Sequence, residues 1–387
     1  MNCRSCGGAT VPLLSLGEQP LANHLLAAPD EPFRRYPLDM RLCGDCHLGQ
    51  LVDLVPPDAL FREYVYFTSV SGPSVESARA LVASIPDRLV NNRWVVEIGS
   101  NDGYLLQFYQ GSGAHVLGID PARGPAITAS CKGITTLVDF FTADLARMLP
   151  RASIIHANNV LAHVPDLNDF VAGLAILLET DGVCYVEVPY LSDLLERCAF
   201  DTIYHEHAYY FSFHALDLLF RRHGLFIDSA EWLAAHGGSL RLRVTHSLSS
   251  FHMFESLLAD AHRMQSRVDD LAQELRSTFA SLRASGHRIW GYGAAAKATV
   301  MLNYCGIDAS LIDAIADETP AKLGKYVPGT GIPIRHPDAW LAAAPPHTCV
   351  FAWNFAHAIA HRYATTYHGK LFTPYTLQLI PKEEVAL

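Results

Sequence analysis

Two segments of the chain, residues 93–106 and residues 287–297, repeat the pattern of a buried strand, a glycine turn and the start of a helix. A buried apolar strand that leads into a glycine turn and a helix is typical of α/β folds. The chain has 387 residues, which is too long for one ordinary core. We therefore expect an α/β protein with more than one domain.

The first of these turns lacks the glycine spacing of a dinucleotide site. It contains Glu97, Gly99, Asn101 and Gly103, whereas the dinucleotide fingerprint is G-x-G-x-x-G, which lets the backbone approach a pyrophosphate. The next expected strand ends in Asp120, which is placed to accept hydrogen bonds from a ribose diol. Carboxylates at both ends of a pocket favour a cationic ligand such as S-adenosylmethionine (SAM). An acid-rimmed Rossmann variant without this ligand is the alternative.

Further candidate contacts to SAM follow along the chain. Asp139 and Phe140 are placed to hold an adenine, with the carboxylate of Asp139 accepting from its amino group. Asn158 lies at the end of an expected strand, where ligands of open parallel sheets bind. His163 lies just beyond that strand and is a candidate catalytic residue.

Residues 201–212 hold two histidines, one glutamate and three tyrosines. Each such side chain, if buried without a hydrogen-bond partner, would cost about 2–7 kcal/mol, so the cluster predicts a reacting centre. A polar network that braces two domains is the alternative. On a helical turn Tyr204 and His207 share a face, whereas on a strand Tyr204 pairs with Glu206 and His205 with His207.

The helix after this cluster has a clear start signal. Ser212 is the expected N-cap of a helix over residues 213–223. The cluster is therefore expected to be an irregular segment that leads into this helix, and such segments often carry function.

Four of the nine cysteines form two closely spaced pairs, Cys3 with Cys6 and Cys43 with Cys46. Four thiolates complete the tetrahedral shell of one Zn²⁺ and leave no position for water, so we expect a single structural zinc ion. Two separate redox or incidental pairs are the alternative. A nucleic-acid-binding zinc module is disfavoured, because no cluster of lysines and arginines lies beside the pairs.

Charge and hydropathy limit the partners that we expect. A net charge of −10 argues against binding nucleic acid or an anionic membrane through the bulk surface. The N-terminus has no apolar signal core, and the apolar runs are too short to cross a bilayer. We expect a cytoplasmic monomer that binds neither nucleic acid nor membrane.

The second glycine turn favours an anionic ligand. Gly293 lies in the turn and Lys297 in the first helical turn, so backbone amides and an ammonium group could bind a pyrophosphate. Asp317 ends the next strand as a candidate ribose or base contact, and Lys325 lies in a basic, glycine-rich loop. Ala296 replaces the third glycine of the fingerprint, which disfavours NAD. A degenerate Rossmann domain with only a structural role is the other alternative.

Motifs along nearly the whole chain resemble those of the three-domain, SAM-dependent C-methyltransferases of nucleotide-linked deoxysugar biosynthesis, which serve antibiotic pathways. Besides the paired cysteines, the motifs are residues 16–23, 96–103, 163–167, 204–207, 236–241 and 291–297. An NAD-linked nucleotide-sugar enzyme and a non-enzymatic zinc-containing binding module are the rival functions.

The resemblance implies three domains. They are a zinc-binding domain over residues 1–70, a SAM-binding methyltransferase domain with the catalytic cluster over residues 71–250, and a linker helix with a Rossmann-like nucleotide-sugar-binding domain over residues 251–387. It also implies methyl transfer to a carbon next to the C-4 ketone of a dTDP-linked 4-keto-6-deoxysugar, with C-3 favoured over C-5.

The implied chemistry assigns roles to the cluster. A sugar carbon becomes nucleophilic only after a proton α to the ketone is removed, so the site needs a base and donors for the enolate oxygen. His207 is the expected base, because an imidazole titrates near neutral pH, whereas a tyrosine has a reference pKa of about 10. Tyr204 and His163 are candidates for enolate stabilisation or proton relay, and Glu206 for orienting an imidazole.

A tyrosine of the aromatic run around Tyr64 and Tyr66 is also expected to face the sugar, because rings stack and hydroxyls form hydrogen bonds. A strand edge packed on the next domain is the alternative. Because the base must act beside enolate donors, the helical-turn geometry is favoured, in which Tyr204 and His207 share a face.

Overall fold

The computed structural model describes residues 1–61, 67–233, 237–253 and 261–381. The chain divides into two compact units. Unit 1 comprises Met1–Val11, Arg41–Asp193 and Glu206–Leu257. Unit 2 comprises Pro12–Met40, Leu194–His205 and Leu258–Leu387. The three domain boundaries expected from the sequence stay a prediction.

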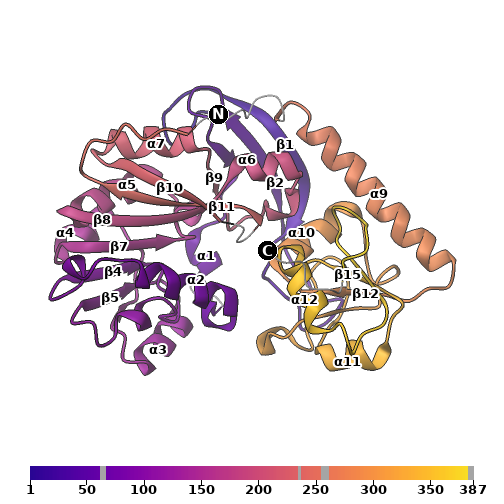
Figure 1. The fold of residues 1–387 in the computed structure, drawn as a ribbon. Helices are drawn as coiled ribbons and strands as arrows, with labels where there is room; N and C mark the ends of the chain where they lie inside the picture. The colour runs from indigo at the N-terminus through magenta and orange to yellow at the C-terminus, as the bar shows by residue number, and fades with distance from the viewer. Residues whose placement is uncertain (62–66, 234–236, 254–260, 382–387) are drawn as a thin grey trace. The chain divides into compact units, whose positions relative to one another are not determined.

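Unit 1 is built on a seven-stranded sheet in the order β10-β11-β8-β7-β4-β5-β6 (Figure 1). Strands β6, β5, β4, β7 and β8 pair in parallel, whereas β11 is antiparallel to both β8 and β10. The strands are β4 (Trp94–Ile98), β5 (His115–Ile119), β6 (Thr136–Leu137), β7 (Ala152–Asn158), β8 (Leu178–Pro189), β10 (Phe226–Leu233) and β11 (Ser239–Thr245).

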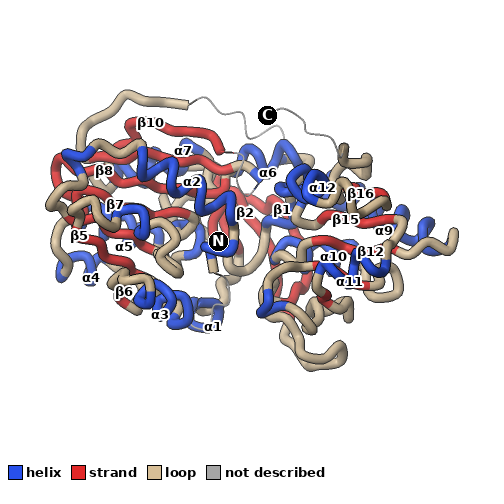
Figure 2. The backbone as a smooth tube through the Cα atoms, turned by 60° about the horizontal axis from the view of Figure 1, so that its bottom comes forward, coloured by secondary structure: helices blue, strands red, loops and turns tan. Residues whose placement is uncertain are grey.

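Helices cover both faces of this sheet (Figure 2). Val96 and Ile155 share a core with α5 and α7, whereas the neighbouring Val95 and Ile154 share one with α2. Side chains alternate along a strand, so the two cores lie on opposite faces. The helices are α1 (Pro57–Phe61), α2 (Gly72–Ala83), α3 (Arg123–Cys131), α4 (Ala143–Met148), α5 (Leu167–Leu177), α6 (Leu191–Arg197) and α7 (Phe213–Arg222).

Two expectations about helix starts had different outcomes. The amide of Ala215 donates to the hydroxyl of Ser212 at 2.9 Å, which confirms the N-cap of α7. The prediction of a helix directly after β4 is wrong. The chain forms turns there and then a short 3-10 helix, Leu106–Tyr109. Asn101 and Gly103 have φ angles of +49° and +73°, and such left-handed residues cannot continue a right-handed helix.

A four-stranded sheet in the order β1-β2-β3-β9 carries the N-terminal segment. Both β1 and β2 contain a point at which the chain passes from one unit to the other. Within unit 1, β3 pairs antiparallel with β9, with Gly49 opposite Tyr210 and Gln50 opposite Tyr209. The strands are β1 (Thr10–Pro20), β2 (Arg35–Cys43), β3 (Gly49–Leu51) and β9 (Tyr209–Tyr210).

Unit 2 contains a five-stranded parallel sheet in the order β14-β13-β12-β15-β16. Its chain order reverses between β12 and β15, the switch point at which ligands of doubly wound sheets bind. The strands are β12 (Ile289–Tyr292), β13 (Ala314–Ala316), β14 (Ile334–Arg335), β15 (His347–Val350) and β16 (Lys370–Phe372). The helices are α9 (Met264–Ala284), α10 (Ala296–Cys305), α11 (Pro337–Ala343) and α12 (Ala356–Arg362).

Figure 1 shows the long helix α9. This helix buries Val268, Leu275 and Phe279 along one stripe. Both units have the expected α/β architecture, and the fold class predicted from the two glycine turns is confirmed. Within the described ranges, no helix combines the length and the hydrophobicity needed to span a bilayer.

Candidate functional site

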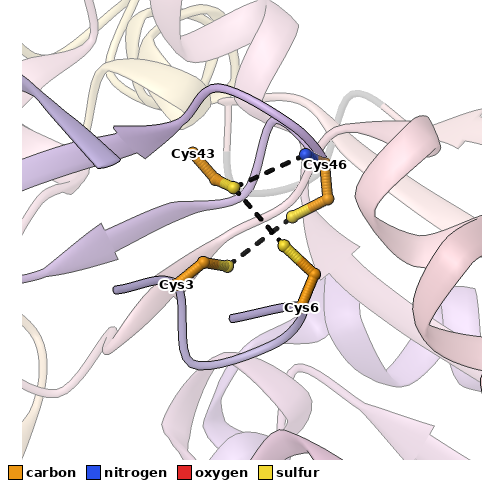
Figure 3. A group of neighbouring side chains, drawn as sticks. All are labelled: Cys3, Cys6, Cys43 and Cys46. Carbon is orange, nitrogen blue, oxygen red and sulfur yellow. Dashed lines mark hydrogen bonds between the residues drawn. The ribbon is translucent and has the colours of Figure 1, made fainter. Parts of the chain in front are cut away.

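The thiols of Cys3, Cys6, Cys43 and Cys46 point toward a common centre in unit 1 (Figure 3). All four sulfur atoms lie within 4.8 Å of one another, with 3.6 Å between the sulfurs of Cys3 and Cys46 and 3.5 Å between those of Cys6 and Cys43. On a tetrahedral zinc ion with Zn–S bonds of about 2.3 Å, the sulfurs would be about 3.8 Å apart. The four thiols therefore fit one Zn²⁺.

Backbone amides support the sulfur atoms. The amides of Gly8 and Cys46 donate to the sulfurs of Cys6 and Cys43 at 3.4 and 3.5 Å. Gly7 has a φ of +82°, a conformation that glycine adopts readily, and it closes the first knuckle. Hydrogen bonds to a thiolate favour its charged form, which is the form that binds metal.

Glu97 is a buried carboxyl near the end of β4, and neither of its oxygens has a hydrogen-bond partner among the described residues. Burial and the nearby carboxyls of Asp120 and Asp102 raise the pKa of Glu97 well above its usual range, against a weaker opposing effect of the Leu106 amide. An unpaired buried carboxylate is costly unless it is protonated or meets a cation. The site thus fits a positively charged ligand group.

The turn after β4 brings the backbone close to the next strand. Gly99 has a φ of +70°, and a Cβ at this position would lie 3.1 Å from the Cβ of Val160. The amides of Asn101 and Ala122 each donate to one oxygen of Asp120 at 2.8 Å. Each of these oxygens keeps a second lone pair, so Asp120 can still accept hydrogen bonds from a ribose.

Three expected SAM contacts end neighbouring parallel strands. Asp120 follows β5, Glu97 lies on β4 and Asn158 ends β7. Within the part of the chain that the structure describes, the buried side-chain oxygen of Asn158 has no hydrogen-bond partner, as expected of a group that faces a ligand. Asp139 is exposed and accepts from the amide of Phe140 at 2.8 Å.

Asp102 was missed as a member of this site, although it is an acidic residue within the glycine turn. Its carboxylate accepts hydrogen bonds from the amide and the hydroxyl of Ser69 and lies 3.3 Å from the ammonium of Lys132. The amide of Thr68 donates to the side-chain oxygen of Asn101 at 2.8 Å. These bonds attach the short turn at residues 68–70 to the glycine turn.

His163 and His207 lie side by side in unit 1, with 4.9 Å between their ring centroids. Nδ1 of His163 lies 2.7 Å from the carbonyl oxygen of Glu206. A carbonyl only accepts, so Nδ1 carries the proton, and in the neutral ring Nε2 is the nitrogen without a proton. The ring of Phe61 packs edge-on against His163 at 5.4 Å. The structure thus brings together two of the expected catalytic residues.

The backbone next to His207 is held on two sides. The amide of Ala208 donates to the carbonyl of Ala162 at 2.8 Å, and the amide of Leu51 donates to the carbonyl of Ala208 at 3.0 Å. The hydroxyl of Tyr209 donates to the carbonyl of Pro165 at 3.0 Å. The chain then enters β9, a strand that the sequence did not indicate.

The boundary between the two units falls inside the cluster, between His205 and Glu206. The backbone turns at these two residues and is irregular on either side, so residues 203–208 do not form a strand. Nε2 of His205 lies 3.3 Å from the carbonyls of Tyr36 and Pro37, and burial lowers its pKa. The expectation that Tyr204 shares a face with the base stays a prediction.

The two tyrosines expected to face the sugar, Tyr64 and Tyr66, lie outside the described residues. Their role therefore stays a prediction.

Two lysines from later segments, Lys297 and Lys322, lie near the glycine turn of unit 2. Gly293 has a φ of +89°, and the amide of Ala294 donates to Asp317 at 2.9 Å. The ammonium of Lys322 lies 3.3 Å from Asp317. The ammonium of Lys297 donates to Asn354 at 2.9 Å.

Aromatic and acidic groups surround Lys297. Its ammonium lies 4.3 Å from the ring centroid of Trp353, and burial lowers its pKa against the opposing charge of Asp201. Asp201 is buried and accepts from the indole of Trp353 at 2.8 Å and from the hydroxyl of Tyr375. Asp201 is the first residue of the polar cluster in the sequence. Its hydrogen bonds are made within unit 2, so it links segments of that unit. Lys325 lies half-buried in the following loop.

Family models match three successive segments of the chain. They are described as "Putative zinc binding domain" over residues 3–61, "Methyltransferase domain" over residues 74–230 and "C-methyltransferase C-terminal domain" over residues 234–374. Among solved structures, a SAM-bound magnesium protoporphyrin IX methyltransferase from Synechocystis is 17% identical with a TM-score of 0.36, and covers 45% of this chain and 79% of its own. Mitomycin 7-O-methyltransferase MmcR is 16% identical with a TM-score of 0.37, and covers 46% and 55%.

A curated relative matches nearly the whole of both chains. C-methyltransferase NovU of Streptomyces niveus is 33% identical over 380 residues, which cover 92% of this chain and 90% of the relative. This match favours neither an NAD-linked enzyme nor a non-enzymatic zinc module. The chain belongs to the family of SAM-dependent C-methyltransferases that carry an N-terminal zinc-binding domain.

Proposed function

We propose that the protein methylates the carbon next to the C-4 ketone of a dTDP-linked 4-keto-6-deoxysugar, at C-3 rather than C-5, in the biosynthesis of an antibiotic sugar. The pair of imidazoles His163 and His207 carries this proposal. A C-methyltransferase that acts on a saturated carbon must first remove a proton from it, and a ketone next to that carbon makes the proton acidic. The pair supplies a base in the same unit as the acid-lined turn.

The residues of the cluster divide the steps of this reaction. When bound, SAM supplies the methyl group. His207 takes the proton from the sugar carbon, and the electron pair of that C–H bond passes into the enolate, which then forms the new C–C bond. A hydrogen-bond donor at the enolate oxygen lowers the barrier to the first step, and we assign this role to Tyr204.

His163 supports the base. Its Nδ1–H is bound to the carbonyl of Glu206, which fixes the ring and directs Nε2 away from that carbonyl. In this orientation His163 can accept a proton from His207 and pass it to solvent. The orienting group is the backbone carbonyl of Glu206, which refines the expectation that Glu206 would orient an imidazole.

We assign the nucleotide part of the substrate to unit 2. Gly293 supplies backbone amides at the switch point of the sheet, and Lys297 and Lys325 supply positive charge for a diphosphate. Asp317 keeps lone pairs for a ribose or a base, although Ala294 and Lys322 already bind it. A tyrosine of the run at Tyr64 and Tyr66 would face the sugar.

The test is a product assay with a panel of dTDP-linked 4-keto-6-deoxysugars that differ at C-3. With SAM present, mass spectrometry should show the gain of one methyl group, and NMR should place it on the carbon next to the ketone. A matched panel of 4-hydroxy sugars should give no product, because without the ketone no enolate forms. Methylation of an oxygen, or equal turnover of the 4-hydroxy sugars, would refute the proposal.

A further inference from the structure

Arg4 lies between the first two cysteines and connects the zinc knuckle to strand β3. Its guanidinium donates to the carbonyls of Leu51 at 2.6 Å and Val52 at 2.7 Å. Its amide donates to the side-chain oxygen of Gln50 at 2.9 Å, and the buried amide group of Gln50 donates to the carbonyl of Asn2 at 3.2 Å. The knuckle and β3 are therefore joined by hydrogen bonds at four points.

Strand β3 in turn holds the backbone beside His207. Gln50 is paired with Tyr209, and the amide of Leu51 donates to the carbonyl of Ala208 at 3.0 Å. The amide of Ala208 donates on its other side to Ala162 at 2.8 Å. His207 is the direct chain neighbour of Ala208, whose amide and carbonyl are both bound, and of Glu206, whose carbonyl binds His163.

We propose that Arg4 is a positioning residue, through which the zinc knuckle and β3 fix His207 beside His163 for proton transfer. The proposal rests on the proposed role of His207 as the base. Hydrogen bonds from a charged guanidinium are about twice as strong as neutral ones, so Arg4 is the strongest of the links described. A shift of the base by about 1 Å can lower the rate about 100-fold, because proton transfer needs close alignment.

A second arginine of the zinc domain provides a matched control. Arg41 also donates to backbone, to the carbonyl of Thr10 at 2.6 Å, and to the hydroxyl of Thr10 at 2.8 Å. Among the described residues, the hydrogen bonds of its guanidinium go to Thr10 and not to β3 or to the backbone around His207, although Arg41 itself lies on β2, the strand next to β3. A loss that follows Arg4 alone would thus separate positioning of the base from general support of the zinc domain.

The experiment compares Arg4→Gln with Arg41→Gln in the full-length, zinc-loaded protein. Zinc content and SAM affinity should stay at wild-type levels in both variants. Amide hydrogen exchange in a peptide covering residues 206–211 should be faster in Arg4→Gln only. The kcat of methyl transfer should fall about 10- to 100-fold in Arg4→Gln with little change in KM, and Arg4→Lys should recover part of the loss.

Unchanged hydrogen exchange over residues 206–211 in Arg4→Gln would overturn the coupling, whatever the substrate proves to be. Faster exchange with an unchanged kcat would overturn the positioning role. If no 4-ketosugar nucleotide is methylated by the wild type, the proposed function fails while the exchange measurement still decides the coupling. If Arg4→Gln loses zinc, the variant Gln50→Met is used in place of Arg4→Gln, because it removes a link to β3 without removing a charge. Hydrogen exchange over residues 206–211 and kcat then decide in the same way.

Discussion

The two glycine turns have the same backbone arrangement, but the charged side chains around them differ in sign. In each turn an amide donates to the carboxylate that ends the next strand, from Asn101 to Asp120 in unit 1 and from Ala294 to Asp317 in unit 2. In unit 1 the strand before the turn adds Glu97, whose buried oxygens form no hydrogen bond with any residue that the structure describes. In unit 2 the last residue of the corresponding strand, Tyr292, donates its hydroxyl to Glu318 at 2.8 Å.

The neighbouring cations explain what the difference means. Among the described residues of unit 1, Lys132 pairs with Asp102, and no salt bridge involves Glu97 or Asp120. In unit 2, Lys322 neutralises Asp317, and Lys297 lies in the first turn of the next helix. The turn of unit 1 therefore fits a cationic ligand such as SAM. The turn of unit 2 has lysines nearby, which is consistent with the nucleotide diphosphate that we propose there.

Removing a zinc ligand should give the largest effect and should affect unit 1, because all four thiols belong to it. Cys43→Ser should lose zinc and give unstable or insoluble protein, since structural zinc contributes on the order of 10–16 kcal/mol in small zinc-binding peptides. Zinc content and thermal unfolding measure the effect. Cys131→Ser, at an exposed cysteine, is the control and should unfold like the wild type. Full zinc content in soluble Cys43→Ser would contradict the assignment.

Glu97→Gln should weaken SAM binding about 10- to 100-fold, because a charge-assisted interaction contributes about 1.5–3 kcal/mol. Calorimetry measures the affinity, and the KM of the nucleotide sugar should stay the same. Glu76→Gln, at an exposed residue of α2, is the matched control. If SAM binds Glu97→Gln as tightly as it binds the wild type, the acid-lined turn is not the site of the cation.

Lys297→Met should raise the KM of the nucleotide sugar about 10-fold, because one ammonium contact to a diphosphate contributes about 1.4 kcal/mol. SAM affinity should not change, which is the converse of the Glu97 result. The control is Lys370→Met, at an exposed lysine of β16. Thermal unfolding must accompany the assay, since Lys297 also opposes the buried charge of Asp201. A change in SAM affinity without a change in KM would reverse the assignment of the two turns.

The pH dependence should be the smallest effect. The folded-state pKa of Glu97 is raised, so its contribution to stability is complete at low pH and is lost as the pH rises through that pKa. A cationic ligand prefers the charged carboxylate form of Glu97, so SAM affinity should rise as the pH rises. The rise should occur above the ordinary carboxyl pKa of 4.5, and it should be at most about tenfold per pH unit. Calorimetry at several pH values should show this slope in the wild type and not in Glu97→Gln.

Local patterns were enough to find the zinc ligands and the acid-lined turn. Cys3 and Cys6 are three residues apart, and Glu97 and Asp120 lie at or next to the ends of their own strands, so each signal is contained in a short segment. The parallel order of β4, β5 and β7 then brings the ends of these strands together. The α/β class followed from the same short segments.

Contacts between distant segments were not predictable in this way. The pairing of Gln50 with Tyr209 joins residues 159 positions apart, and no local periodicity encodes the register of such a pair. The hydrogen bond from Ser69 to Asp102 and the hydrogen bond from Trp353 to Asp201 were also not predictable, because each joins residues far apart in the sequence. The prediction of a helix directly after β4 failed for a local reason. Every second residue from Gly99 to Gly103 is left-handed, and such residues cannot form the first turn of a helix.

The most direct test of the account is solvent deuterium exchange at the substrate carbon. In D₂O the wild type should exchange the hydrogen next to the ketone, because proton removal precedes methyl transfer. His207→Asn should slow both exchange and methyl transfer by about 10²- to 10⁴-fold, the usual contribution of a general base, with SAM affinity unchanged. His115→Asn, at an exposed histidine of β5, should behave as the wild type. Exchange that continues at the wild-type rate in His207→Asn would show that another group is the base.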